Sequence, residues 1–195
     1  KLDAPVVEID QPGTVTFANG DTITAGQIVL AIPPRVIATI KITPDFDAAV
    51  RQSLINIPTW MGGQAKFVAT YARPFWRDEG LSGDAMSRHG PMVEIHDASA
   101  MDGSPGALFG FIGVPAAQRD GQSDALRAAS IAQLGRLFGP EALKPQKTEL
   151  RDWAYAPQTA SALDHQALGG HPRYGLPSAL RNLWQGKLIM GSTEI

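Results

Sequence analysis

The chain has 195 residues, of which 44% are hydrophobic and 18% charged, and its formal net charge is −2. This composition is typical of a globular protein that buries a core as one domain or slightly more. The chain has no cluster of lysine and arginine and no apolar run of membrane-spanning length, so we expect neither nucleic-acid binding nor membrane insertion. The absence of cysteine excludes disulfides and thiolate metal sites within the chain.

The first part of the chain has the pattern of short strands. Residues 2–9 predict a strand, and the Asn19-Gly20-Asp21 sequence predicts a hairpin turn after a second one. Residues 27–32 predict a short buried strand that two prolines end. Residues 35–42 are expected to form a connector, and residues 44–55 a helix.

The middle of the chain predicts an antiparallel sheet backed by one helix. We expect its strands at residues 65–71, 92–96 and 107–113. Ser123 or Asp124 is expected to cap a helix that runs through Phe138 and is ended by Gly139-Pro140. Its expected apolar face consists of Leu126, Ile131, Leu134, Leu137 and Phe138.

The last part of the chain predicts two further strands around a long loop. The strands are expected at residues 149–155 and 188–190, and the loop at residues 156–177. The four histidines lack metal-like spacing, so no metal site is predicted.

A single lysine stands near the start of the strand predicted at residues 65–71. Lys66 lies in an otherwise apolar segment, eight residues before the sequence Pro74-Phe75-Trp76-Arg77. Burying an ammonium group is costly unless another group compensates it. Taken alone, this residue is better interpreted as a solvated lysine at the start of an edge strand than as a functional one.

Motifs on both sides of this lysine add a resemblance that covers nearly the whole chain. Four motifs follow one another along the chain. They are a Pro5-Val6 strand followed by a hairpin and Ala31-Ile32-Pro33-Pro34, the run from Lys66 to Arg77, the Asp152-Trp153 pair and the final segment 187–194. Together they resemble the flavin-dependent monoamine oxidase family. In the final segment, Gly191 and Ser192 stand where alanine and glycine are usual.

The resemblance implies roles for six residues. Lys66 would sit under the flavin ring and hold a water against its reactive nitrogen, and Val6 would bind the adenine end of FAD through its backbone. Trp153 would pack against the flavin edge, and Ser192, Thr193 and Glu194 would contact the cofactor after the last strand. An ordinary core aromatic at Trp153 and an ordinary turn at Thr193 and Glu194 are the alternatives.

The substrate pocket departs from the family pattern. The cysteine that bonds the flavin and the tyrosine of the aromatic cage in mitochondrial members would fall near Ala162 and Leu163, where neither occurs. We therefore expect FAD to be bound non-covalently. Trp60, Tyr155 and Tyr174 are candidate substitutes for the cage, because aromatic faces suit an amine through cation–π attraction.

The expected fold is α+β: an antiparallel sheet with a backing helix, forming a substrate domain, flanked by pieces of an FAD-binding α/β Rossmann-like domain. Residues 1–43 would belong to the FAD-binding domain, residues 44–150 to the substrate-binding domain, and residues 151–195 would return to the FAD-binding domain. No Gly-x-Gly-x-x-Gly motif occurs. We therefore expect a fragment of a larger flavoenzyme, with a degenerate protein that lost its cofactor half as the alternative.

The function implied by the resemblance is oxidation of a small-molecule amine by hydride transfer to FAD, with dioxygen as acceptor. A related flavoenzyme with another substrate, such as an amino acid, a polyamine or a porphyrin precursor, is a second hypothesis. A non-redox small-molecule binding or interaction module is the third. The fragment alone is expected to be inactive and cytoplasmic. A periplasmic location, the amine used and the oligomeric state stay open.

Overall fold

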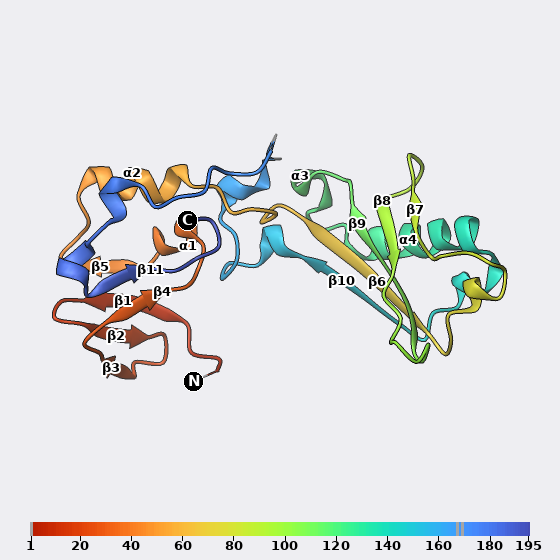
Figure 1. Ribbon diagram of the computed structural model, residues 1–195, viewed down its shortest axis with the longest axis horizontal. Coiled ribbons are helices and arrows are strands. Elements are labelled where there is room, and N and C mark those ends of the chain that lie inside the picture. The colour runs from red at the N-terminus through yellow and green to blue at the C-terminus, as the bar shows by residue number, and fades with distance from the viewer. Residues whose placement is uncertain (1, 167, 169) are drawn as a thin grey trace. The chain divides into compact units, whose positions relative to one another are not determined.

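The computed structural model describes residues 2–166, 168 and 170–195, and the chain forms two compact units (Figure 1). Unit 1 comprises Lys1–Gly62 and Tyr155–Ile195, and unit 2 comprises Gly63–Ala154. The domain boundary expected between residues 43 and 44 falls inside unit 1. Residues 44–62 stay with unit 1 because Val50 and Leu54 are buried in its core.

Unit 1 contains a four-stranded sheet in the order β3-β2-β1-β5. Its strands are β1 (Val6–Asp10), β2 (Thr14–Phe17), β3 (Thr22–Thr24) and β5 (Lys41–Thr43). β2 and β3 pair antiparallel across Asn19-Gly20-Asp21, which confirms the predicted hairpin. β5 pairs parallel with β1 in a segment that was expected to be only a connector. β1 starts later than expected, after Asp3 adopts a left-handed backbone conformation with φ of 51°.

A second, two-stranded parallel sheet in unit 1 pairs β4 (Ile28–Leu30) with β11 (Leu188–Met190). The helices of this unit are α1 (Pro34–Ile37) and α2 (Ala48–Asn56). α2 begins four residues later than expected because Asp47 is its N-cap and accepts a hydrogen bond from the Val50 amide at 2.9 Å. The core of unit 1 consists of Ile9, Leu30, Ile37, Ile42, Val50, Leu54, Leu180, Leu183 and Leu188.

Unit 2 is an antiparallel five-stranded sheet in the order β10-β6-β9-β8-β7. Its strands are β6 (Ala65–Tyr71), β7 (Ala85–Met86), β8 (Met92–Asp97), β9 (Gly106–Ile112) and β10 (Lys147–Asp152). Its helices are α3 (Ala116–Arg119) and α4 (Ser123–Phe138). Short 3₁₀ turns of the two units span Phe75–Arg77, Pro140–Leu143, Trp153–Tyr155, Ala162–His165, Ser178–Leu180 and Leu183–Gly186.

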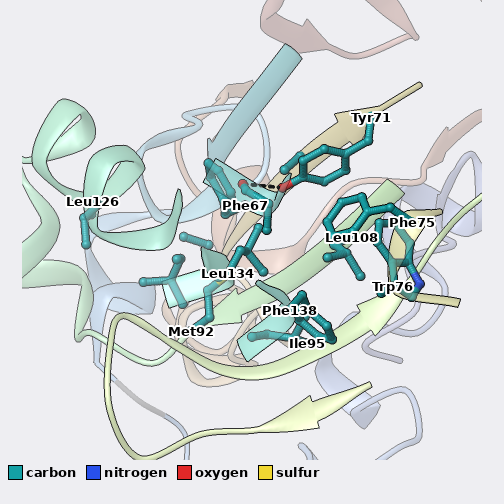
Figure 2. Close-up of a cluster of buried hydrophobic side chains, with 14 residues drawn as sticks. Phe67, Tyr71, Phe75, Trp76, Met92, Ile95, Leu108, Leu126, Leu134 and Phe138 are labelled. Carbon is teal, nitrogen blue, oxygen red and sulfur yellow. Dashed lines mark hydrogen bonds between the residues drawn. The ribbon is translucent and has the colours of Figure 1, made fainter. Parts of the chain in front are cut away.

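The core of unit 2 lies between α4 and one face of the sheet (Figure 2). Ala65, Phe67, Ala69 and Tyr71 alternate inward along β6, as period-two patterning requires. The Tyr71 hydroxyl, which is buried in this core, donates a hydrogen bond to the Ala142 carbonyl at 2.9 Å. Most of the expected helix face is buried, but Leu137 is 37% exposed because it lies beside the buried stripe of α4.

β10 ends earlier than the strand expected at residues 149–155. Asp152 is the last residue of the strand, and its carboxylate accepts a hydrogen bond from the Ala154 amide at 3.1 Å. This side-chain contact turns the backbone into the 3₁₀ turn that contains Trp153 and Tyr155.

A buried glutamine joins α4 to β8 in unit 2. Gln133 is fully buried, accepts a hydrogen bond from the Met92 amide at 2.9 Å and donates one to the Met92 carbonyl at 2.7 Å. Gly90 permits this approach, since a Cβ atom there would lie 2.4 Å from Gln133 Oε1. The amide side chain therefore satisfies both backbone groups of Met92 in the core.

We predict that Gln133→Leu destabilises unit 2 by about 3 kcal/mol, because it leaves a buried N–H and a buried C=O without partners. Denaturant unfolding followed by circular dichroism measures the change. The matched control is Gln118→Leu at an exposed site, which should change the unfolding free energy by less than about 0.5 kcal/mol. Equal effects of the two substitutions would contradict this role for Gln133.

A buried carboxylate joins three segments of unit 1. Asp164 accepts hydrogen bonds from the Thr59 amide at 3.0 Å and from the Ser161 amide at 2.8 Å, and it pairs with Arg35 at 2.7 Å. Burial alone raises the pKa of Asp164, but these donors outweigh it and hold the pKa below its usual value. Asp164 thereby fixes the segment that carries Trp60.

We predict that Asp164→Asn destabilises unit 1 by about 3 kcal/mol at neutral pH, because Arg35 loses its buried partner. The native pKa of Asp164 is lowered, so its contribution is full above the unfolded pKa of about 3.9 and is lost as the pH falls through the folded value. The difference between wild type and variant should therefore shrink below about pH 4. Hydrogen exchange at the Thr59 and Ser161 amides measures it, with Asp3→Asn as the exposed control. A difference that stays constant from pH 7 to about pH 2 would refute the assignment.

Candidate functional site

The outer face of β6, opposite the core of unit 2, carries Lys66. Its Nζ atom lies 4.6 Å from the centroid of the Phe111 ring and 4.9 Å from that of Phe109. Phe111 is the direct cross-strand neighbour of Lys66 on β9. The two aromatic faces attract the ammonium group, and this contact compensates its partial burial.

The same outer face continues onto β8 with polar side chains. Glu94 pairs with Phe111 and His96 pairs with Phe109 in the cross-strand register. The ring nitrogens of His96 lie 2.8 Å from Glu94 Oε1 and 3.0 Å from Asp84 Oδ1. The hydrogen bond to Glu94, followed by the weaker one to Asp84, raises the pKa of His96 against the effect of burial. None of the family motifs includes this row of side chains. The alternation of residues along β8 is the sequence pattern that indicates which of them share one face.

Trp153 lies at the same end of the β6–β10 pair as Lys66. Arg151 is the cross-strand partner of Lys66, Asp152 is that of Ala65, and the Trp153 amide donates to the Gln64 carbonyl at 3.0 Å. The two residues of unit 2 to which the resemblance gives a place beside the flavin thus lie at the same end of the sheet.

An arginine that sequence reasoning missed fixes this end of the sheet. Arg119 is 4% exposed and contacts both oxygens of Asp152, through Nε at 2.7 Å and Nη2 at 2.8 Å. It also donates to the carbonyls of Val114 at 2.5 Å and Gly63 at 2.8 Å. Paired charges with their hydrogen bonds satisfied are the form in which ions are tolerated in a protein interior. Arg119 therefore holds the residues next to Lys66 and Trp153.

The turn after β11 carries the predicted cofactor contacts of unit 1. Ser192 Oγ is buried without a hydrogen-bond partner among the described residues, and Glu194 is 5% exposed. Thr193 between them is exposed. The turn follows the carboxyl end of β11, which pairs parallel with β4, and ligands bind at this end of parallel strands in α/β folds. A buried hydroxyl without a partner fits the polar groups of a ligand such as FAD.

Val6 lies at the start of β1, also in unit 1. It pairs with Phe17 on β2, whereas the pairing of β1 with β5 covers only Glu8 to Asp10. The register between β1 and β2 shifts after Val6. The backbone of Val6 is therefore not paired with β5. A backbone contact to a ligand requires backbone groups that the sheet does not use.

The three candidate substrate aromatics lie in unit 1, and the structure brings two of them together. The His171 ring lies between Trp60, at 4.5 Å between centroids, and Tyr174, at 4.4 Å. Tyr155 instead packs against His165 at 4.8 Å. Part of the loop that joins these histidines lies outside the described residues.

In residues 2–166, 168 and 170–195, no three His, Asp or Glu side chains gather as a group that could hold a metal ion. Within that same part, no helix is long and apolar enough to cross a membrane.

Comparisons with known proteins agree with these features. The family model described as flavin containing amine oxidoreductase matches residues 1–179. A protein of Dictyostelium discoideum named "Probable flavin-containing monoamine oxidase A" is 32% identical over 157 residues, which are 78% of this chain and 34% of that protein. A putrescine oxidase of Kocuria rosea is 30% identical over 176 residues, 84% of this chain and 35% of that protein. The chain thus spans about a third of the length of these relatives.

A solved structure shows the same fold. Cyclohexylamine oxidase from Brevibacterium oxydans IH-35A superposes with a TM-score of 0.67 at 26% identity, over 97% of this chain and 42% of that one. The order of motifs, the mixed α/β fold and the family match over residues 1–179 lead to one assignment. The chain belongs to the flavin-containing amine oxidoreductase family, whose members use FAD.

Proposed function

We propose that the chain is part of an FAD-dependent enzyme that oxidises a small-molecule amine, with dioxygen as the final electron acceptor. The observation that carries this proposal is the position of Lys66 on the outer face of β6, over Phe109 and Phe111 and at the end of the sheet where Trp153 lies. Unit 1 would bind part of the cofactor, and unit 2 would supply Lys66.

The residues of unit 1 would hold FAD through backbone and hydroxyl groups. The Val6 backbone is outside the β5 ladder, and Ser192 Oγ lacks a protein partner. Glu194, nearly buried in the same turn, would accept hydrogen bonds from cofactor hydroxyls. When bound, the flavin supplies the hydride acceptor, and the chain supplies position and electrostatics.

Lys66 would act on oxygen reactivity through its charge. No carboxylate pairs with Lys66 in the part of the chain that the structure describes. Its ammonium, held over two phenyl rings, has N–H groups left to orient a water molecule. A fixed positive charge in a poorly solvated site stabilises negative charge that develops on dioxygen as it accepts electrons.

The attachment of FAD is proposed to be non-covalent. The chain contains no cysteine, and residues 162 and 163, where the family's cysteine and tyrosine would fall, are alanine and leucine. They belong to the 3₁₀ turn Ala162–His165, whose Asp164 is bonded to Thr59 and Ser161. The carboxylate of this turn is therefore used in hydrogen bonds within unit 1.

A small-molecule binding module without redox activity is the second hypothesis. Such a module would bind its ligand through the aromatic side chains of unit 1 and the outer face of unit 2. It would need no ammonium group beside a flavin. The match of the flavin-containing amine oxidoreductase family model to residues 1–179 favours the oxidase.

The visible absorbance spectrum of the purified enzyme, before and after acid precipitation, tests the proposal. We expect a flavin spectrum, release of the chromophore into the supernatant, and bleaching when a primary amine is added without oxygen. Chromophore that stays with the precipitate would disprove non-covalent binding. A colourless protein that does not take up added FAD would favour the binding module.

We predict that Lys66→Met leaves FAD bound and slows reoxidation of the reduced flavin by dioxygen by at least about tenfold, because a stabilising charge worth more than 1.4 kcal/mol is lost. Stopped-flow mixing of the reduced enzyme with oxygen measures the rate. The matched control is Lys147→Met, an exposed lysine that pairs with Thr70 at the opposite end of β6. Unchanged reoxidation in the Lys66 variant, or equal slowing in the control, would remove Lys66 from this role.

A further inference from the structure

Two cations stand directly opposite each other on the outer face of the sheet in unit 2. Arg151 on β10 is the cross-strand partner of Lys66 on β6. Leu150, the neighbour of Arg151, packs against the core, so Arg151 points to the opposite face, which Lys66 shares. The Cβ atoms of directly paired residues are only about 5 Å apart, and like charges in such pairs repel each other. The pair is therefore unfavourable for the stability of the sheet itself.

The ammonium group of Lys66 lies on the side of β6 away from Arg151. β6 runs between β10 and β9 in the sheet. Lys66 Nζ lies 4.6 Å from the ring centroid of Phe111 and 4.9 Å from that of Phe109, and both rings belong to β9. Repulsion by Arg151 and attraction by the two rings act in the same direction, so together they hold the ammonium over β9.

Two carboxylates on the same face of the sheet leave Lys66 unpaired. The Oε1 atom of Glu94 on β8 lies 2.8 Å from Nε2 of His96, which holds it. Glu149 on β10 lies two residues from Arg151, whose charge attracts it along the same strand. Among the residues that the structure describes, neither carboxylate forms a salt bridge with Lys66. The basic side chains of this face thus keep its carboxylates from the ammonium.

We infer that Arg151 is a positioning residue for Lys66, whose ammonium it keeps over Phe109 and Phe111 and away from carboxylates. The inference rests on the proposed function, which gives Lys66 a part in the reaction with dioxygen. An ammonium without a carboxylate partner presents its full positive charge to water and to dioxygen as it takes up electrons. An ammonium drawn into an ion pair would present less of it.

Charge reversal at Arg151 in the FAD-loaded enzyme tests the inference. Arg151→Glu places a carboxylate directly opposite Lys66, and the resulting ion pair should draw the ammonium away from the rings. We expect reoxidation of the reduced flavin by dioxygen to slow about three- to tenfold, with Arg151→Gln between this variant and wild type. The rate of flavin reduction at saturating amine should stay nearly unchanged. Stopped-flow absorbance measures both rates, and unchanged reoxidation in Arg151→Glu would contradict the inference.

Two comparisons separate positioning of Lys66 from a general effect of charge. Lys147→Glu makes the same change of charge on the same face of β10, at the opposite end of the strand, and should leave reoxidation unchanged. In the Lys66→Met background, Arg151→Glu should cause no further slowing, because it acts through Lys66. Equal slowing in Lys147→Glu, or further slowing in the double variant, would overturn the inference.

Nuclear magnetic resonance of the enzyme, isotopically labelled at its lysine ε-carbons, gives a readout that does not depend on activity. The ε-protons of Lys66, assigned by the loss of their signal in Lys66→Met, should be shifted upfield by the ring currents of Phe109 and Phe111. This upfield shift should shrink in Arg151→Glu and persist in Lys147→Glu. The same shift in Arg151→Glu as in wild type would show that Arg151 does not position the ammonium.

The two readouts distinguish failure of this inference from failure of the proposed function. If Lys66→Met slows reoxidation but Arg151→Glu changes neither readout, Arg151 does not position Lys66 and the oxidase stands. If the upfield shift is lost in Arg151→Glu but reoxidation is unchanged there and in Lys66→Met, Arg151 does position Lys66. What fails in that case is the role of Lys66 in the proposed function.

Discussion

The alternation of side chains along β6 is the constraint on which the site in unit 2 depends. Phe67 and Tyr71 point into the core against α4, and Lys66 therefore points to the other face. A shift of one residue in register would place the ammonium in the core and the phenyl ring of Phe67 in the solvent-facing row. Burial of the inner residues, at about 25 cal/mol per Å² of apolar surface, thus fixes the face on which the charge of Lys66 lies. Gln133 strengthens this arrangement, because it ties α4 to β8 through Met92.

Buried charges hold the irregular segments that the sheets leave unsupported. In unit 2, Arg119 joins the end of β10 to the carbonyls of Val114 and Gly63. In unit 1, Asp164 joins the Thr59 segment to Arg35 on α1. Each charged group meets several partners from segments distant in the chain, so removing one partner leaves a buried charge behind. Such networks position loops more sharply than apolar contacts do, because hydrogen bonds are directional.

The elements that could be predicted from the sequence are those whose pattern is local. β6 and β11 have the predicted bounds, and α4 ends at Gly139 as predicted. The predicted N-cap was wrong, because Ser123 is already helical and Gln122 precedes it without a side-chain capping hydrogen bond. β5 could not be predicted, because it exists only by pairing with β1 across more than thirty residues. For the same reason the role of Arg119 could not be predicted, because nothing in its neighbourhood of the chain shows that Asp152 will lie beside it. The family motifs pointed to Lys66 and Trp153, and the roles proposed for them in catalysis stay predictions.

The glycine that departs from the family motif at the end of β11 lies against the side chain of Val29. A Cβ atom on Gly191 would lie 2.9 Å from a methyl group of Val29, its neighbour on β4, so alanine could fit there only if Val29 moved. Glycine at this position keeps the β4–β11 ladder intact up to the hydrogen bond from the Gly191 amide to the Leu30 carbonyl at 3.1 Å. The next residue, Ser192, then adds a hydroxyl that no described group of the chain satisfies. A buried hydroxyl without a partner costs about 1–3 kcal/mol, and the proposed contact of Ser192 with a polar group of the cofactor would remove that cost.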